Sequence, residues 1–282
     1  MNRWQISGLI YLYLLPAAVA AIGFGVGQVD LHLYLPLWAV NVCVLLLAIW
    51  QFIKPDPNAG ERKFGSWTSA ALLLIIPWIL FSVFAGMGPP PINMAAWVTT
   101  ALTQQLRYTI LICGGLSAFL GFALLRTKLE NRGERLYSTL GFTLLGVAIP
   151  LFILNMAFWG YYLTAAFRYF VTLPQGNRPE WYAPVKMFFD VIAVVEVALT
   201  YLATIFFAIA LKKIDLLTVR ASRWYIIIAS LGIVLVLLPS SMPEPFPAAG
   251  YLAAIPAIPF IMPYLIGVRL LRCNKSQVNY TG

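Results

Sequence analysis

Charged residues are scarce in this sequence, and their scarcity sets the class of protein. Of the 282 residues, only 10% are Asp, Glu, Lys or Arg, whereas 61% are hydrophobic. Soluble domains carry roughly 25% charged residues, and a soluble core of this length could not hide so much apolar surface. The mean hydropathy of +0.83 therefore predicts a protein whose main solvent is lipid.

Metal ligands and catalytic motifs are scarce as well. One histidine, His32, excludes a zinc site with two histidines and a bis-histidine haem within this chain. Three widely spaced cysteines (Cys43, Cys113 and Cys273) do not form a disulfide framework. We interpret Asp30 and His32 as part of a solvated turn and not as a metal site. Phosphate-binding loops, histidine-rich iron motifs and nucleophile elbows are absent. The sequence therefore identifies no catalytic residue and no cofactor.

Long apolar blocks are abundant. A window of about nineteen residues finds eight of them, at 7–27, 34–53, 67–86, 108–125, 138–162, 186–211, 224–238 and 251–271. The first continues too far to be a signal peptide core, and the seventh is short enough that we expect it to extend by a few residues. The predicted fold class is an all-α, polytopic transmembrane helix bundle of about eight spans, forming a single domain over 1–282.

Basic residues predict the orientation. With eight spans, 15 of the 19 Lys and Arg residues fall on the side that holds both termini, and four fall on the other side: Arg107, Arg168, Arg178 and Lys186. The positive-inside rule then predicts cytoplasmic termini. We expect an integral protein of the bacterial inner (cytoplasmic) membrane. The basic residues that give the net charge of +9 lie between the apolar blocks. The predicted partner is therefore the lipid bilayer and not nucleic acid.

The third loop, 87–107, is predicted to lie outside and begins with three prolines at 89–91. Its middle, 92–106, is apolar enough to predict a short helix on the outer surface. The eighth span contains Pro256, Pro259 and Pro263, which predict a kinked or partly unwound helix. Small residues four apart, as at Ser117 and Gly121, predict close packing between helices.

The sixth span concentrates polar groups on one face. At about 100° per residue, Glu196, Thr200 and Asp190 fall within one arc, together with Ala193 and Thr204. Bulky apolar residues occupy most of the rest, so the polar face is predicted to point into the bundle.

Glu196 is the carboxylate that lies deep within a span. It follows Lys186 by ten residues, which is about 15 Å of helix. An unpaired charge at that depth is costly, so Glu196 is either a binding group for a proton, a cation or a polar headgroup, or a protonated side chain that bonds a neighbouring helix. Asn41 and Asn155 have similar predicted depth and are candidates for the same pocket, or for ordinary interhelical hydrogen bonds.

Asp190 lies four residues after Lys186, a spacing at which the two side chains meet on a helix. We favour an interfacial ion pair over a role in binding. The candidate substrate-binding residues are Glu196, Thr200, Asn41, Asn155 and, as the weakest of them, Asp190.

These features favour a transporter or channel-like protein with a polar seam on the sixth span. The alternative is a membrane subunit of a larger complex, or a membrane-embedded enzyme that binds a lipid or quinone between its helices. A signalling or assembly factor is a third class, disfavoured because the cytoplasmic loops are short. Possible ligands are a lipid or a small solute, and partner subunits belong to the alternative.

Overall fold

The computed structural model describes residues 3–25, 29–53, 66–174, 178–239 and 241–276. In this part of the chain, seven helical stretches are long and apolar enough to cross a bilayer, which confirms the predicted fold class. They are formed by α1 (Arg3–Gly25), α2 (Leu31–Ile53), α3 (Ser66–Phe81) with the 3₁₀ turn η1 (Ser82–Gly86), α5 (Ala101–Glu130), α6 (Leu136–Ala157) with the π-helical turn η2 (Phe158–Tyr162) and α7 (Leu163–Phe170), α8 (Tyr182–Lys213), and α9 (Val219–Leu237).

The eighth predicted span is divided into two helices. These are α10 (Phe246–Ala254) and α11 (Ile261–Ser276), and short turns join them, including the bond from Ile258 N to Ile255 O at 2.9 Å. Pro256 and Pro259 lack the N–H groups that would continue a helix through this segment. The expectation of a partly unwound helix is thus confirmed, while the number of continuous crossings among the described residues is seven and not eight.

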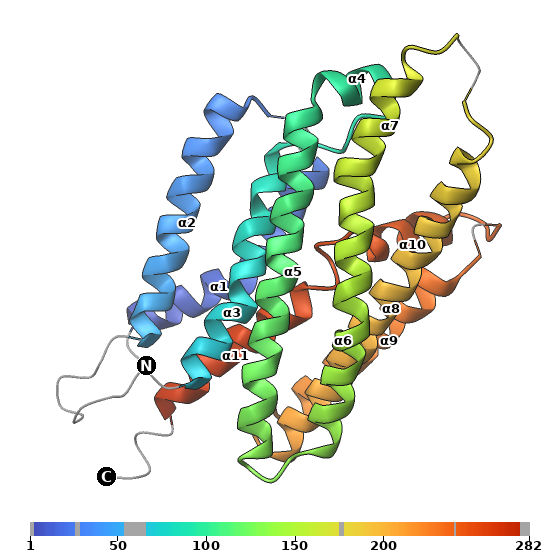
Figure 1. Ribbon diagram of the computed structural model, residues 1–282. Coiled ribbons are helices and arrows are strands. Elements are labelled where there is room, and N and C mark those ends of the chain that lie inside the picture. The colour runs from blue at the N-terminus through green and yellow to red at the C-terminus, as the bar shows by residue number, and fades with distance from the viewer. Residues whose placement is uncertain (1–2, 26–28, 54–65, 175–177, 240, 277–282) are drawn as a thin grey trace.

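The two halves of the divided segment have different neighbours. α10 packs on α9 and α8, whereas α11 packs mainly on α3, with smaller contacts to α1 and α2. The other helices form a row in which each packs on the next, in the order α9, α8, α6, α5 and α3. α10 lies against one end of this row and α11 against the other (Figure 1).

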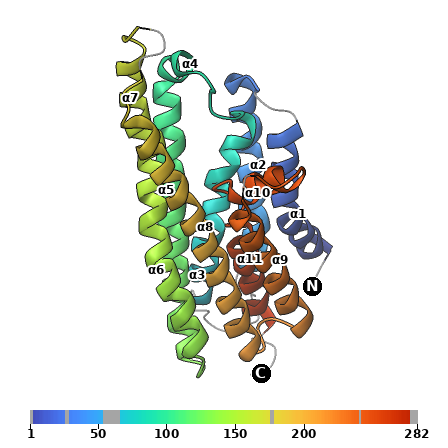
Figure 2. The same cartoon turned by 90° about the vertical axis from the view of Figure 1, so that its right-hand side faces the viewer.

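The start of α1 and the end of α11 lie at the same end of the bundle. The turns between α5 and α6 and between α8 and α9 lie at that end too, as both views show (Figures 1 and 2). This arrangement agrees with an even number of passes through the bundle, provided that α10 and α11 count together as one. That this end faces the cytoplasm remains a prediction from the charges.

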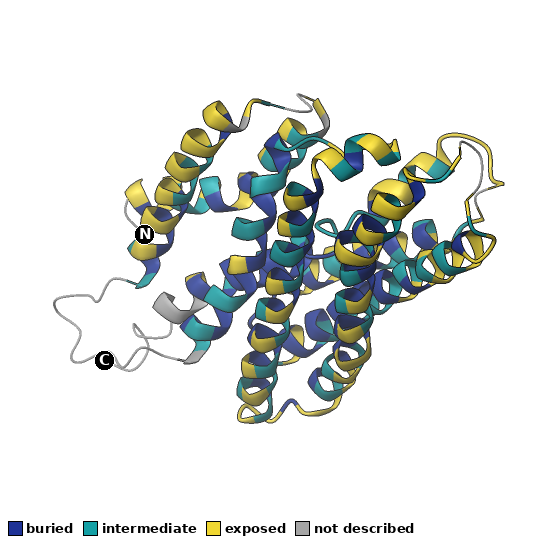
Figure 3. Ribbon diagram, turned by 45° about the horizontal axis from the view of Figure 1, so that its top comes forward, coloured by how far each residue is buried: buried dark blue, intermediate teal, exposed yellow. Residues whose placement is uncertain are grey.

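Burial is uneven across the bundle (Figure 3). In α3 and η1, 61% of the spanning window is buried, against 22% in α1, α2 and α9. Two observations show that α3 and α5 pack closely. Ser117 donates a hydrogen bond to Leu73 O at 2.9 Å, and a Cβ at Gly121 would lie 3.0 Å from the Leu74 side chain. The packing predicted from small residues is confirmed for this pair.

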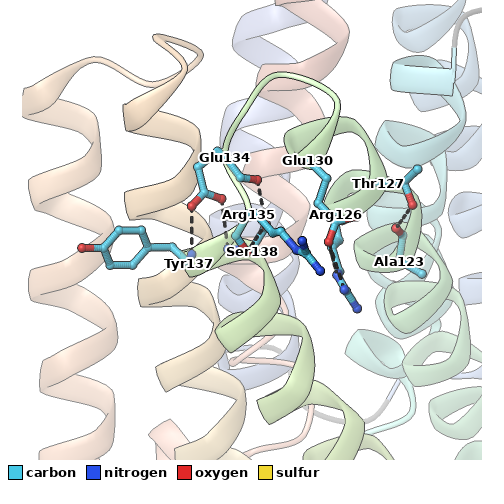
Figure 4. Close-up of polar contacts among 8 residues, drawn as sticks. All are labelled: Ala123, Arg126, Thr127, Glu130, Glu134, Arg135, Tyr137 and Ser138. Carbon is cyan, nitrogen blue, oxygen red and sulfur yellow. Dashed lines mark hydrogen bonds and ion pairs between the residues drawn. The ribbon is translucent and has the colours of Figure 1, made fainter.

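The turn between α5 and α6 is held by a buried carboxylate, Glu134 (Figure 4). Its two oxygens accept the backbone N–H groups of Tyr137 at 2.8 Å and Ser138 at 3.0 Å. These donors have no partner within the first turn of a helix, so Glu134 supplies the missing acceptors. Arg126 and Glu130 form an ion pair at 2.9 Å on the preceding turn. Sequence analysis did not single out Glu134.

Helix starts differ from the apolar blocks. α9 begins at Val219, which confirms that the seventh block extends. α5 begins at Ala101, so the predicted outer loop and its 92–106 helix are too long, and the separate helix is only α4 (Met94–Thr99). The first turns of α5 contain polar residues such as Gln104 and Arg107, which lower the hydropathy of a sequence window without breaking a helix.

Candidate functional site

The polar face of α8 points into the protein, as predicted. Glu196 is 2% exposed and Thr200 is 6% exposed, whereas Phe188 and Val191 on the other face are more than half exposed. The Thr200 hydroxyl donates to Glu196 O at 2.8 Å, which leaves the Glu196 carboxyl free to make contacts outside its own helix. Because α6 is the closest neighbour of α8, the polar face meets α6.

Asn155 of α6 is the partner of Glu196. Its Nδ2 donates to Glu196 Oε1 at 3.1 Å, and this hydrogen bond is buried. Two further oxygens of the same pair, Glu196 Oε2 and Asn155 Oδ1, are buried without a hydrogen-bond partner. Buried polar atoms are nearly always bonded, and a proton on the Glu196 carboxyl group would let one of these two oxygens donate to the other.

A change of helical winding follows Asn155 within one turn. The π-helical turn η2 begins at Phe158, and the Phe158 ring stacks on Phe189 of α8 with centroids 3.8 Å apart. Within η2, Gly160 faces Tyr108 of α5 so closely that an added Cβ would lie 2.6 Å from the Tyr108 Cβ. Such π-turns often occur at functional sites.

The break between α10 and α11 lies near this pair on both helices. Tyr201 of α8, five residues after Glu196, donates its hydroxyl to Ala253 O at 3.1 Å. Phe152 of α6, three residues before Asn155, packs edge-on against Phe260, with centroids 5.5 Å apart. Ala253 is in the last turn of α10 and Phe260 directly precedes α11, so the divided segment contacts both helices that carry the Glu196–Asn155 pair.

The structure does not bring Asn41 to this site. The Tyr11 hydroxyl donates to Asn41 Oδ1 at 2.5 Å and contacts Asn41 O at 3.2 Å, and α2 packs on α1, η1 and α11. The pocket suggested for Asn41, Asn155 and Glu196 is therefore wrong for Asn41. Depth along the membrane is the same for residues on opposite sides of a bundle, so depth alone did not separate the two asparagines.

Asp190 forms the predicted ion pair with Lys186. The Nζ–Oδ2 distance is 2.7 Å, and the two side chains are 41% and 48% exposed. Both partners are on the surface of α8, apart from the buried carboxyl of Glu196.

Metal-ligand residues do not cluster in the part of the chain that the structure describes: no three His, Cys, Asp or Glu side chains gather there. Asp30 Oδ1 accepts the backbone N–H of His32 at 2.9 Å at the exposed start of α2, so His32 belongs to the first turn of a helix and not to the predicted loop. Cys43 and Cys113 are free and exposed, and the side chain of Cys273 lies outside the described residues.

A second buried polar group lies on the first turns of α5, where the sequence predicted an outer loop. Gln104 and Arg107 are 2% and 6% exposed, although both had been assigned to the third outer loop. Their spacing to Leu111 and Gly114 on α5 follows a helical period, and this signal extends the fourth apolar block backwards to Ala101.

Fold and site together define an α-helical, multi-pass integral membrane protein with one buried carboxyl–amide pair between two spanning helices. Comparison with protein-family models, with curated proteins and with solved structures gives no significant match. The functional argument therefore depends on the site itself.

Proposed function

We propose that the protein moves an ion or a small solute across the membrane, as a transporter or channel-like protein, with the Glu196–Asn155 pair at its polar centre. The observation that carries this proposal is the buried carboxyl group of Glu196, bonded on one oxygen and open on the other. Ionisable groups within spanning helices are costly in lipid and mark ion or proton pathways. An amide or hydroxyl would serve a purely structural interhelical bond without an ionisable group, so the presence of an acid favours a role for its proton.

The open oxygens indicate a proton as the coupled ion. Asn155 Nδ2 already donates to Glu196 Oε1. A proton on Glu196 Oε2 would supply a donor for Asn155 Oδ1, and the two groups would then form a closed acid–amide pair. Loss of that proton leaves two acceptors and a charge without partners in a low-dielectric region. Protonation thus favours the closed pair, and deprotonation favours separation of α6 and α8.

Access to the pair requires movement, because Glu196 and Asn155 are each only 2% exposed. The divided segment beside them is the element best suited to move. Discontinuous helices in transporters lie at binding sites, where their unwound backbone lines the pathway. In this protein α10 and α11 pack on different helices, so each half can follow its own neighbours.

The test is proton flux in sealed vesicles. The purified protein is reconstituted in vesicles that contain a pH-sensitive dye, and a potassium diffusion potential drives protons inward. Wild-type protein should acidify the vesicle interior, and Glu196→Gln should abolish this flux. Asp190→Asn is the matched control, because it removes an exposed, ion-paired carboxylate from the same helix, and it should retain the wild-type rate.

Two results would contradict the proposal. Equal proton flux through the wild type and Glu196→Gln across the pH range would show that Glu196 is not part of the proton pathway. Equal loss of flux in Asp190→Asn and Glu196→Gln would show that the assay responds to charge on α8 in general and not to the buried carboxyl.

A further inference from the structure

The first turns of α5 contain a buried cation, the guanidinium group of Arg107. Arg107 is 6% exposed, and it is the seventh residue of a helix that begins at Ala101. Its Nη2 donates to two backbone carbonyls, Met87 O at 3.3 Å and Gly88 O at 3.0 Å. Gly88 has a φ of 65°, a conformation that glycine adopts readily.

The positive charge of Arg107 has no acidic partner in the described residues. The ion pairs found there are Arg126–Glu130 and Lys186–Asp190, and both involve partly exposed side chains. Carbonyl oxygens bind the guanidinium through their dipoles and leave its net charge in place. A buried charge without a counter-charge is strongly destabilising.

Donors of the same guanidinium remain open. Nε of Arg107 is buried without an acceptor, although a guanidinium has five N–H donors in a fixed fork. Phe84 lies beside the group, with its centroid 6.0 Å from Arg107 Cζ, and gives only a weak cation–π contact at this distance. Gln104, one turn earlier, has its Nε2 bonded to Thr100 Oγ1 at 3.2 Å and its Oε1 buried without a partner, and a neutral amide cannot supply the counter-charge.

The residue after Arg107, Tyr108, packs against α4. Trp97 of α4 donates its Nε1 to Thr164 Oγ1 at 3.0 Å, and its ring stacks on Tyr108 with centroids 6.3 Å apart. These contacts join α4, α5 and α7 around the residue that follows Arg107 in the chain. The guanidinium itself is positioned by its bonds to Met87 O and Gly88 O, and a donor that is already positioned favours binding.

We propose that Arg107 is the anchor of an anion site that accepts a phosphate or carboxylate group. Both groups accept charge-assisted hydrogen bonds from arginine, and Nε can donate one while Nη2 keeps its bonds to Met87 O and Gly88 O. An anion on Nε would supply the missing acceptor and the missing negative charge together. The same chemistry is offered by the headgroup of an anionic phospholipid and by a small soluble anion, and the experiment separates these two sources. This inference is independent of proton transport.

The experiment measures thermal stability from tryptophan fluorescence in nanodiscs of a zwitterionic phospholipid. In one arm, inorganic phosphate is titrated at constant ionic strength against chloride. In the other, part of the lipid is replaced by phosphatidylglycerol without added phosphate. A ligand that binds the folded state raises Tm, so at least one arm should stabilise the wild type by several degrees.

Arg107→Gln should lose this stabilisation, whereas Arg168→Gln should keep it, because Arg168 is exposed and its replacement removes the same charge. Stabilisation by phosphate assigns a soluble anion, and stabilisation only by phosphatidylglycerol assigns a headgroup.

Arg107→Lys keeps the charge and loses the Nε donor, so it should bind about tenfold more weakly, a difference of ~1.4 kcal/mol. It also carries the test should Arg107→Gln not fold. The proposal is overturned if neither arm stabilises the wild type, or if Arg107→Lys responds in both arms with wild-type affinity.

Discussion

Replacement of Glu196 by glutamine tests the protonation state of the buried carboxyl directly. In a closed acid–amide pair, the Gln amide keeps the shape of the acid, donates to Asn155 Oδ1 and accepts from Asn155 Nδ2. Both contacts survive, and the volume is conserved, so the free energy of unfolding should change by no more than about 1 kcal/mol. An ionised Glu196 gives a different result, because removal of an unpaired buried charge should stabilise the protein by several kcal/mol.

The matched variant is Glu196→Leu, which removes the carboxyl and leaves the Asn155 amide buried without a partner. It should destabilise the protein by about 1–3 kcal/mol. The double variant with Asn155→Leu removes both polar groups, and the coupling energy from the cycle should be about 0.6–1.7 kcal/mol, the range found for interhelical hydrogen bonds in membranes.

The assay is unfolding in mixed micelles with a rising fraction of denaturing detergent, followed by tryptophan fluorescence. Stabilisation of Glu196→Gln by more than about 2 kcal/mol would refute the protonated pair. A coupling energy near zero would show that the hydrogen bond at 3.1 Å contributes nothing to holding α6 and α8 together.

Three further variants test contacts in other parts of the bundle by the same assay. Glu134→Ala removes both acceptors at the start of α6 and should cost about 1–2 kcal/mol, whereas an unchanged midpoint would show that water replaces the carboxylate. Gly160→Ala places a Cβ 2.6 Å from the Tyr108 Cβ and should cost about 1–3 kcal/mol by overpacking; wild-type stability would mean that η2 shifts freely. Tyr264→Phe removes the 2.8 Å bond to Leu12 O and should cost about 0.5–1.5 kcal/mol, and no loss would mean that this carbonyl needs no donor.

Composition and periodicity determined the membrane class, because a chain that is 61% hydrophobic has no other stable solvent. They also determined the inward face of the sixth span, since Glu196 and Thr200 fall on one side of any helix in this register. The local ion pair of Lys186 and Asp190 followed from spacing alone. Each of these properties depends on residues close together in the chain.

Tertiary structure decided which distant side chains meet. Asn41 and Asn155 are equivalent by depth and residue type, and only the packing of α6 on α8 selects Asn155 as the partner of Glu196. The helix packing also placed Arg107 inside the protein, although its position in the sequence predicted the end of an outer loop. The physical reason is that a hydrophobicity window reports the average cost of burial in lipid, whereas the contacts of a single buried polar group depend on which helix lies opposite it.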